Sequence, residues 1–143
     1  MTYDLERFVA GQEPVYHDVV RELRLGRKTS HWMWFIFPQV AGLGSSVTSI
    51  FYSVTTLDEA RAYLGHPVLG ARLRECTRLV LAVRGRTIDE IFGVPIDVRK
   101  LHSCMTLFHR VAPEEPLFSG VLDRFYGGVD DAATEERLAA TGR

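Results

Sequence analysis

Two groups of polar residues in this chain have the types and spacing that binding and catalysis require. The first group accompanies a run of aromatic residues, with Lys28 before it, His31 at its start and Gln39 after it. The second group recurs every three residues and consists of Asp97, Lys100, Ser103 and Thr106. Residues three apart are neighbours on a helix surface, so we expect the second group to line one flank of a helix that borders a groove.

From these two groups we predict that His31, Asp97 and Lys100 are catalytic. Imidazole titrates near neutral pH, so His31 could act as a general acid or base, or it could instead make a structural hydrogen bond to a backbone carbonyl. Lysine is rare in the chain, and beside an apolar face Lys100 could bind a phosphate or have its pKa lowered by burial. The plainer interpretation of Asp97 and Lys100 is an ion pair at a helix start, which contributes roughly 0.2 to 0.5 kcal/mol.

The aromatic run from His31 to Phe37, with the sequence HWMWFIF, contains both tryptophans of the chain. It is apolar in every direction, so we expect it to be buried. Its length does not separate a strand from a helical turn, but its surroundings favour a short buried helix. Trp32 and Trp34 could form a wall on which a base or nicotinamide ring stacks, worth roughly 1 to 3 kcal/mol per base. The alternative is that both are plain core.

A glycine-rich turn follows the aromatic run, with Gly42, Gly44, Ser45 and Ser46 close together. Glycine lets backbone amides converge on a phosphate, but the turn lacks the lysine of a P-loop and the strand of a Rossmann fold, so an ordinary turn is the alternative. The spacing of the histidines and cysteines fits no known metal motif, and we expect neither a metal nor a cofactor. The predicted ligand-binding residues are Lys28, Trp32, Trp34, Gln39, Gly44, Ser45, Ser103 and Thr106.

Helix caps and apolar periodicity predict an all-α fold. Two capping boxes, Thr56 to Glu59 and Thr87 to Glu90, begin helices, and an Asp4 cap begins the first one. The predicted helical segments are 4–12, 14–26, 31–37, 46–52, 56–65, 66–85, 87–93, 96–109 and 113–126, with a charged tail helix after residue 130. We expect one domain over residues 1–143, made of about seven to nine short helices, with 130–143 as a tail that frays.

The composition narrows the class of protein. The chain has 143 residues, 46% of them hydrophobic, which is enough to bury a core without disulfides. Its 17 basic and 18 acidic side chains nearly cancel, so nucleic acid is an improbable partner. No basic and apolar leader and no stretch of eighteen apolar residues is present, so we expect a cytoplasmic protein with no membrane association, either a monomer or a homodimer.

Three long segments carry a resemblance to a known family: SHWMWFIFPQVAGLG, AYLGHPVLGARLREC and IFGVPIDVRKLHSCMTLF. In order and spacing they resemble the bacterial domain-of-unknown-function family 1810, some of whose members carry a calpastatin label. The resemblance covers nearly the whole chain and implies an all-α fold, but the family has no established activity. Calpain inhibitors of that type are disordered and rich in proline and lysine, whereas this chain is compact and aromatic, so its composition contradicts the label.

The chain departs from that family in one place and resembles a second family more faintly. Where the family pattern has two serines, this chain has Ser103 followed by Cys104, which puts a role for a hydroxyl at Cys104 in doubt. A helix that begins His-Pro-x-Leu, a short helix that ends in aromatic-Gly and a lysine-bearing segment resemble the NADAR family. That all-α family is associated with N-glycosidic bonds, which implies a pocket for a nucleotide-like or ADP-ribose-like ligand.

The sequence therefore leads to two hypotheses of different class. In the first, a groove between residues 28–46 and the helix 96–109 binds, and can hydrolyse, a nucleotide-like or ADP-ribose-like ligand. In the second, the chain is a non-enzymatic protein interaction module and its motifs are core. A polar-lined cavity beside the tryptophans would favour the first hypothesis, and a closed surface would favour the second.

Overall fold

A computed structural model describes residues 3–140 of the chain. These residues form helices and no β-strand, apart from a single bridge between Val40 and Val54. The helices are α1 (Glu6–Gln12), α2 (Tyr16–Arg24), α3 (Met33–Ile36), α4 (Val47–Phe51), α5 (Leu57–Gly65), α6 (Leu69–Ala82), α7 (Ile88–Phe92), α8 (Pro95–Val111), α9 (Pro116–Phe125) and α10 (Ala132–Ala140). The all-α prediction is confirmed, although the described residues hold ten helices rather than seven to nine.

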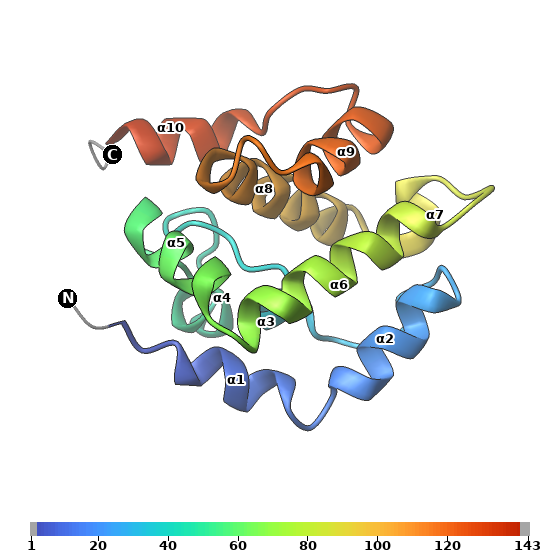
Figure 1. Cartoon of the computed structure of the whole chain (residues 1–143), viewed down its shortest axis with the longest axis horizontal. Coiled ribbons are helices and arrows are strands. Elements are labelled where there is room, and N and C mark those ends of the chain that lie inside the picture. Colours follow the sequence, from blue (N-terminus) through green and yellow to red (C-terminus); the bar gives the residue numbers. More distant parts are fainter. Residues whose placement is uncertain (1–2, 141–143) are drawn as a thin grey trace.

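The two longest helices, α6 and α8, organise the packing. Helix α6 contacts α2, α5 and α9, and α8 contacts α5, α7, α9 and α10. Figure 1 shows α6 crossing the middle of the molecule, with α8, α9 and α10 on one side and α1 and α2 on the other. Within residues 3–140, no helix is both long and apolar enough to cross a membrane.

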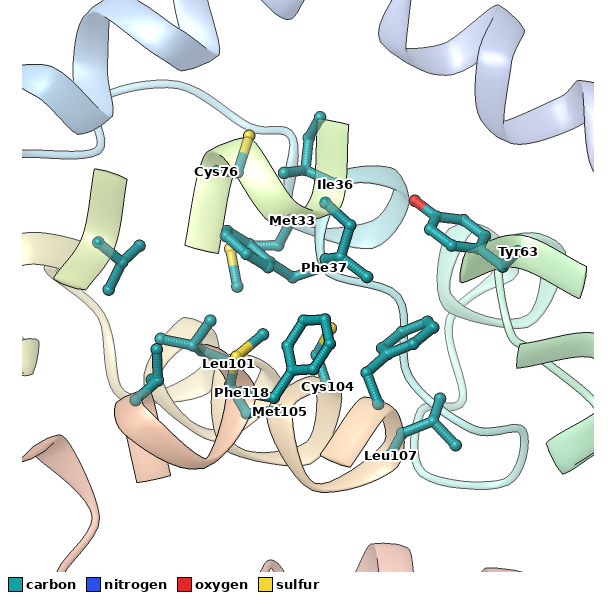
Figure 2. Close-up of a cluster of buried hydrophobic side chains, with 14 of the residues drawn as sticks. Met33, Ile36, Phe37, Tyr63, Cys76, Leu101, Cys104, Met105, Leu107 and Phe118 are labelled. Carbon is teal, nitrogen blue, oxygen red and sulfur yellow. The ribbon is translucent and has the colours of Figure 1, made fainter. Parts of the chain in front are cut away.

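The aromatic run lies at the centre of this arrangement, as the sequence predicts. Its middle forms the single helical turn α3, whose Met33 and Ile36 are buried together with the neighbouring Phe37. Figure 2 shows these three side chains facing Leu101 and Met105 of α8 across the core. The predicted helix is therefore shorter than the run, and the burial is incomplete, because His31 is exposed and Trp34 is half-buried. Helix α3 contacts both α6 and α8.

Two of the predicted helix caps differ from the structure. Helix α1 has Leu5 at its N-cap and no side-chain cap, so the Asp4 cap is wrong. Thr56 accepts a hydrogen bond from the Glu59 amide as expected, but the Glu59 carboxylate bonds Thr55 instead of the Thr56 amide, and it pairs with Arg7. The neighbouring Thr55 and the half-buried Arg7 of α1 thus occupy the two oxygens of the carboxylate that the capping box would have used. The capping box at the start of α7 is confirmed.

Glycine at position 70 allows α5 and α6 to approach closely. A Cβ atom on Gly70 would lie 2.0 Å from the Leu64 carbonyl oxygen, which belongs to the backbone and cannot rotate away. We therefore expect Gly70→Ala to lower the free energy of unfolding by about 2 kcal/mol, measured by urea denaturation. Gly65→Ala is the matched control, because nothing lies within 4 Å of its added Cβ. Equal stability of the two variants would contradict this account.

Candidate functional site

A groove with a volume of about 750 Å³ lies between the 28–46 segment and the first turns of α8. This volume falls in the range of small-molecule sites, roughly 300 to 1,000 Å³. The groove brings together all but two of the residues that the sequence analysis assigned to a site. Those that line it are Lys28, His31, Trp32, Trp34, Gln39, Gly44, Ser45, Asp97 and Lys100.

A buried ion pair joins the two sides of the groove. The Lys28 Nζ atom lies 2.9 Å from the Asp97 Oδ2 atom, and the two side chains are 6% and 11% exposed. The Lys28 backbone amide also donates to the Ile91 carbonyl oxygen at 2.7 Å, which fixes the loop against the end of α7. Because Asp97 pairs with Lys28 across the groove, the local pair with Lys100 that the sequence suggested is not formed.

The Lys100 ammonium is the least compensated charge of the groove. Lys100 is only 9% exposed, yet within residues 3–140 its Nζ atom has no hydrogen-bond acceptor and no salt-bridge partner. The Nζ atom lies 4.8 Å from the centroid of the Trp34 ring, a cation–π distance. Burial lowers the pKa of Lys100, Lys28 lowers it further, and Asp97 opposes the shift. An anion in the groove would supply the partner that the described residues do not.

The two tryptophans face different environments. Trp32 is 1% exposed, and its ring packs against Phe37 and Phe92 at centroid distances of 6.2 and 6.5 Å. Trp34 is half-buried, and its indole N–H has no acceptor within the described residues. Trp32 therefore belongs to the core although it also lines the groove, while Trp34 is the more accessible of the two rings.

Glu22 organises the loop that carries Lys28 and His31, and the sequence analysis missed it. Its Oε1 atom accepts from the Thr29 and Ser30 amides and from the Trp32 Nε1 atom, at 2.8, 3.1 and 2.9 Å. Its Oε2 atom accepts from the Ser30 hydroxyl at 2.5 Å. Burial raises the pKa of Glu22, but these hydrogen bonds outweigh it and lower the pKa to about 2. A negative charge close to a helix C-terminus interacts unfavourably with the helix dipole. The position of Glu22 near the end of α2 was therefore the sequence signal that could have identified this residue.

His31 and Gln39 place further polar groups on the groove. His31 is exposed, and its ring makes no hydrogen bond or ion pair with any residue from 3 to 140, so the structural hydrogen bond considered above is not formed. The Gln39 backbone carbonyl accepts a hydrogen bond from the Val54 amide at 2.9 Å, which fixes the chain at this position. Gln39 also lines the groove. No cluster of histidine, cysteine and acidic residues in the described part of the chain could hold a metal ion.

The glycine-rich turn is explained by packing. A Cβ atom on Gly44 would lie 2.6 Å from the Ser49 Cβ atom, so glycine is needed for this approach. Ser46 begins α4 by accepting from the Ser49 amide at 3.1 Å. Gly44 and Ser45 both line the groove, but α4 is a short helix and its N-terminus adds little positive potential.

Ser103 and Thr106 lie away from the groove. The Ser103 hydroxyl bonds the Thr134 hydroxyl at 2.7 Å, and the Thr106 hydroxyl accepts from the Asp131 amide at 2.9 Å. Both therefore hold α10 on α8, and Thr134 and Leu138 of this predicted fraying tail are buried; residues 141–143 lie outside the described residues. The reason is geometric: each three-residue step on a helix turns back by about 60°, so Thr106 ends up opposite Asp97.

Comparisons with known proteins agree with this fold. A family model described as "Protein of unknown function (DUF1810)" matches residues 2–138. The crystal structure of the conserved hypothetical protein Rv1873 from Mycobacterium tuberculosis superposes with a TM-score of 0.93 at 54% sequence identity, covering 96% of this chain and 97% of that chain. No curated protein matches the chain significantly.

Proposed function

The chain belongs to the DUF1810 family, whose description names no activity, and from the chemistry of the groove we propose that it binds a nucleotide-like or ADP-ribose-like small molecule. The observation that carries this proposal is the Lys100 ammonium, which is nearly buried, has no charge partner among residues 3–140 and lines the groove. A buried cation without a partner costs stability, so its retention is best explained by a ligand that neutralises it. A phosphate group is the natural candidate.

The other charges of the groove support an anionic ligand. Two ammonium groups, those of Lys28 and Lys100, face one carboxylate, that of Asp97. The pair between Lys28 and Asp97 cancels one charge, so the groove keeps the positive charge of Lys100, close to the Trp34 ring, and that of Arg99, an exposed residue that also lines the groove. A phosphate beside an aromatic wall is the combination that a nucleotide needs, because its base can stack while its phosphate meets the lysine.

We propose hydrolysis of an N-glycosidic bond as a second step in the same groove. His31 is the proton-transfer group in this proposal, because it lines the groove and has no other partner among residues 3–140. Asp97 already accepts from Lys28, and its remaining oxygen would orient the attacking water. Water would form a bond to the anomeric carbon as the bond from that carbon to the leaving nitrogen breaks. The leaving nitrogen would take a proton from the His31 imidazolium, and the water would give up its proton to the free oxygen of the Asp97 carboxylate.

A non-enzymatic interaction module is the second candidate, and helix α4 favours it. Val47, Ile50 and Phe51 are 85%, 62% and 54% exposed, which is unusual for large apolar side chains on one short helix. Against this candidate, the cavity beside Trp34 is open and lined by polar residues, whereas a closed surface would be expected of a protein whose motifs serve only as core.

A ligand screen tests the binding proposal. AMP, NAD and ADP-ribose should each be added while thermal unfolding and tryptophan fluorescence are followed. At a hundred times its dissociation constant, a ligand should stabilise the protein by about 2.7 kcal/mol, which raises Tm by roughly 8 °C. Trp34→Phe should remove the fluorescence response and Trp32→Phe should keep it, because Trp34 is the more accessible of the two rings. If none of the ligands changes Tm or tryptophan fluorescence, the binding proposal is refuted and the non-enzymatic interaction module becomes the better-supported function.

A further inference from the structure

A second, smaller cavity adjoins the groove, and we call it the side chamber. Its volume is about 280 Å³. The residues that line both the groove and the side chamber are Trp34, Gln39, Gly44, Ser49 and Lys100. The two spaces therefore meet at Lys100 and Trp34, which lie at their junction.

The side chamber is built from fixed parts of the core. Phe37 and Val40 are each 1% exposed and form its floor. The Tyr52 ring is held by Phe8 and Phe35, at centroid distances of 5.8 and 5.3 Å. Side chains fixed in this way give a chamber whose shape exists before a ligand arrives, which reduces the entropy cost of binding.

The wall of the side chamber at Ser53 is held by Arg7, whose side chain is 11% exposed. Arg7 donates to the carbonyl oxygens of Phe51 and Ser53, each at 2.8 Å, and pairs with Glu59 at 3.1 Å. The segment that closes the chamber is thus tied to α1 and α5 at the same time. Its lining is mainly apolar, and its volume is just below the roughly 300 Å³ at which sites for whole drug-sized ligands begin. A single ring is the size of group that it suits.

Resting on the function proposed above, we propose that the ligand has two arms joined by an anionic linker. The linker, a pyrophosphate or similar group, lies at the junction, where the Lys100 ammonium and the Trp34 indole N–H are both without a partner in the described residues. The nucleoside arm occupies the groove, and a single sugar or heteroaromatic ring occupies the side chamber. A mononucleotide would fill only the groove.

Binding measurements with AMP and ADP-ribose test this proposal, because the two share one arm and differ in the other. We expect wild-type protein to bind ADP-ribose at least about tenfold more tightly than AMP in isothermal titration calorimetry. Ala41→Leu and Ser53→Leu enlarge residues that line only the side chamber. Each should reduce ADP-ribose affinity to that of AMP and leave AMP binding within about twofold of wild type.

The control is Ala139→Leu, the same type of substitution at an exposed position of α10, which should bind both ligands as the wild type does. If wild-type protein binds AMP and ADP-ribose equally, or if the side-chamber variants weaken both ligands alike, the two-armed ligand is refuted while binding in the groove stands. If neither ligand binds, the proposed function itself fails and the two-armed ligand with it. Should one side-chamber variant not fold, the other variant and the wild-type comparison still decide the question.

Discussion

Replacing Glu22 by alanine is expected to lower the free energy of unfolding by about 3 to 4 kcal/mol. The carboxylate accepts from two backbone amides, a serine hydroxyl and the Trp32 indole, and Glu22 is nearly buried. Its loss leaves the buried Trp32 indole N–H and three part-buried donors without their acceptor, which costs more than the loss of the bonds alone. Urea denaturation at pH 7 measures this effect. A change below about 1 kcal/mol would mean that water replaces the carboxylate in the loop.

The same carboxylate gives the protein a predictable dependence on acid. Since the pKa of Glu22 falls from 4.5 to about 2 in the folded protein, the ionised form is favoured by folding. Its contribution, about 3 kcal/mol, is fully present above pH 4.5 and is lost as the pH falls towards 2. Glu22→Gln cannot ionise, so it should be less stable than wild type at pH 7 and should lose less stability on acidification. Parallel pH profiles for the two proteins would refute this assignment.

Local patterns were sufficient to predict most of the fold, because caps, glycines and apolar periodicity act over a few residues. The stripe of α6, with Leu69, Leu73, Cys76 and Val80 buried, follows directly from helical spacing. The failure at Glu59 has a local and a long-range cause, since Thr55 takes one oxygen of that carboxylate and Arg7, far away in the sequence, takes the other. A capping rule that considers only neighbouring residues has no means of including such a competitor.

Some residues of the candidate site could be predicted from their type alone. The chain has few lysines, and Lys28 and Lys100 both reach the groove. Which tryptophan faces the groove was not predictable, because the aromatic run is apolar on all sides and no polar residue marks its outer face. The three-residue repeat that runs from Asp97 to Thr106 was misleading for a different reason. Each three-residue step rotates the position around the helix, so only a few consecutive steps stay on one helix face.

Replacing Lys100 by methionine is expected to weaken ligand binding at least about a hundredfold, equivalent to about 2.7 kcal/mol, while making the free protein more stable. Methionine fills a similar volume and removes the nearly buried ammonium that lacks a partner in the described residues. Burial lowers the pKa of Lys100, so the folded state disfavours the charged form. The resulting penalty is fully present below the lowered pKa and is relieved as the pH rises through it, so the variant should be more stable than wild type at pH values where Lys100 is charged.

Lys28→Met is the matched control, and its effect on stability should have the opposite sign. Lys28 pairs with Asp97 at 2.9 Å, so its removal leaves a nearly buried carboxylate without a cation and should cost about 2 kcal/mol. Thermal unfolding without ligand compares the two variants, and calorimetry with ADP-ribose measures their binding. If both variants lose stability to the same extent, Lys100 has a structural role equal to that of Lys28. If the Lys100 variant is more stable and no longer binds, its ammonium is retained for a ligand at the expense of the fold.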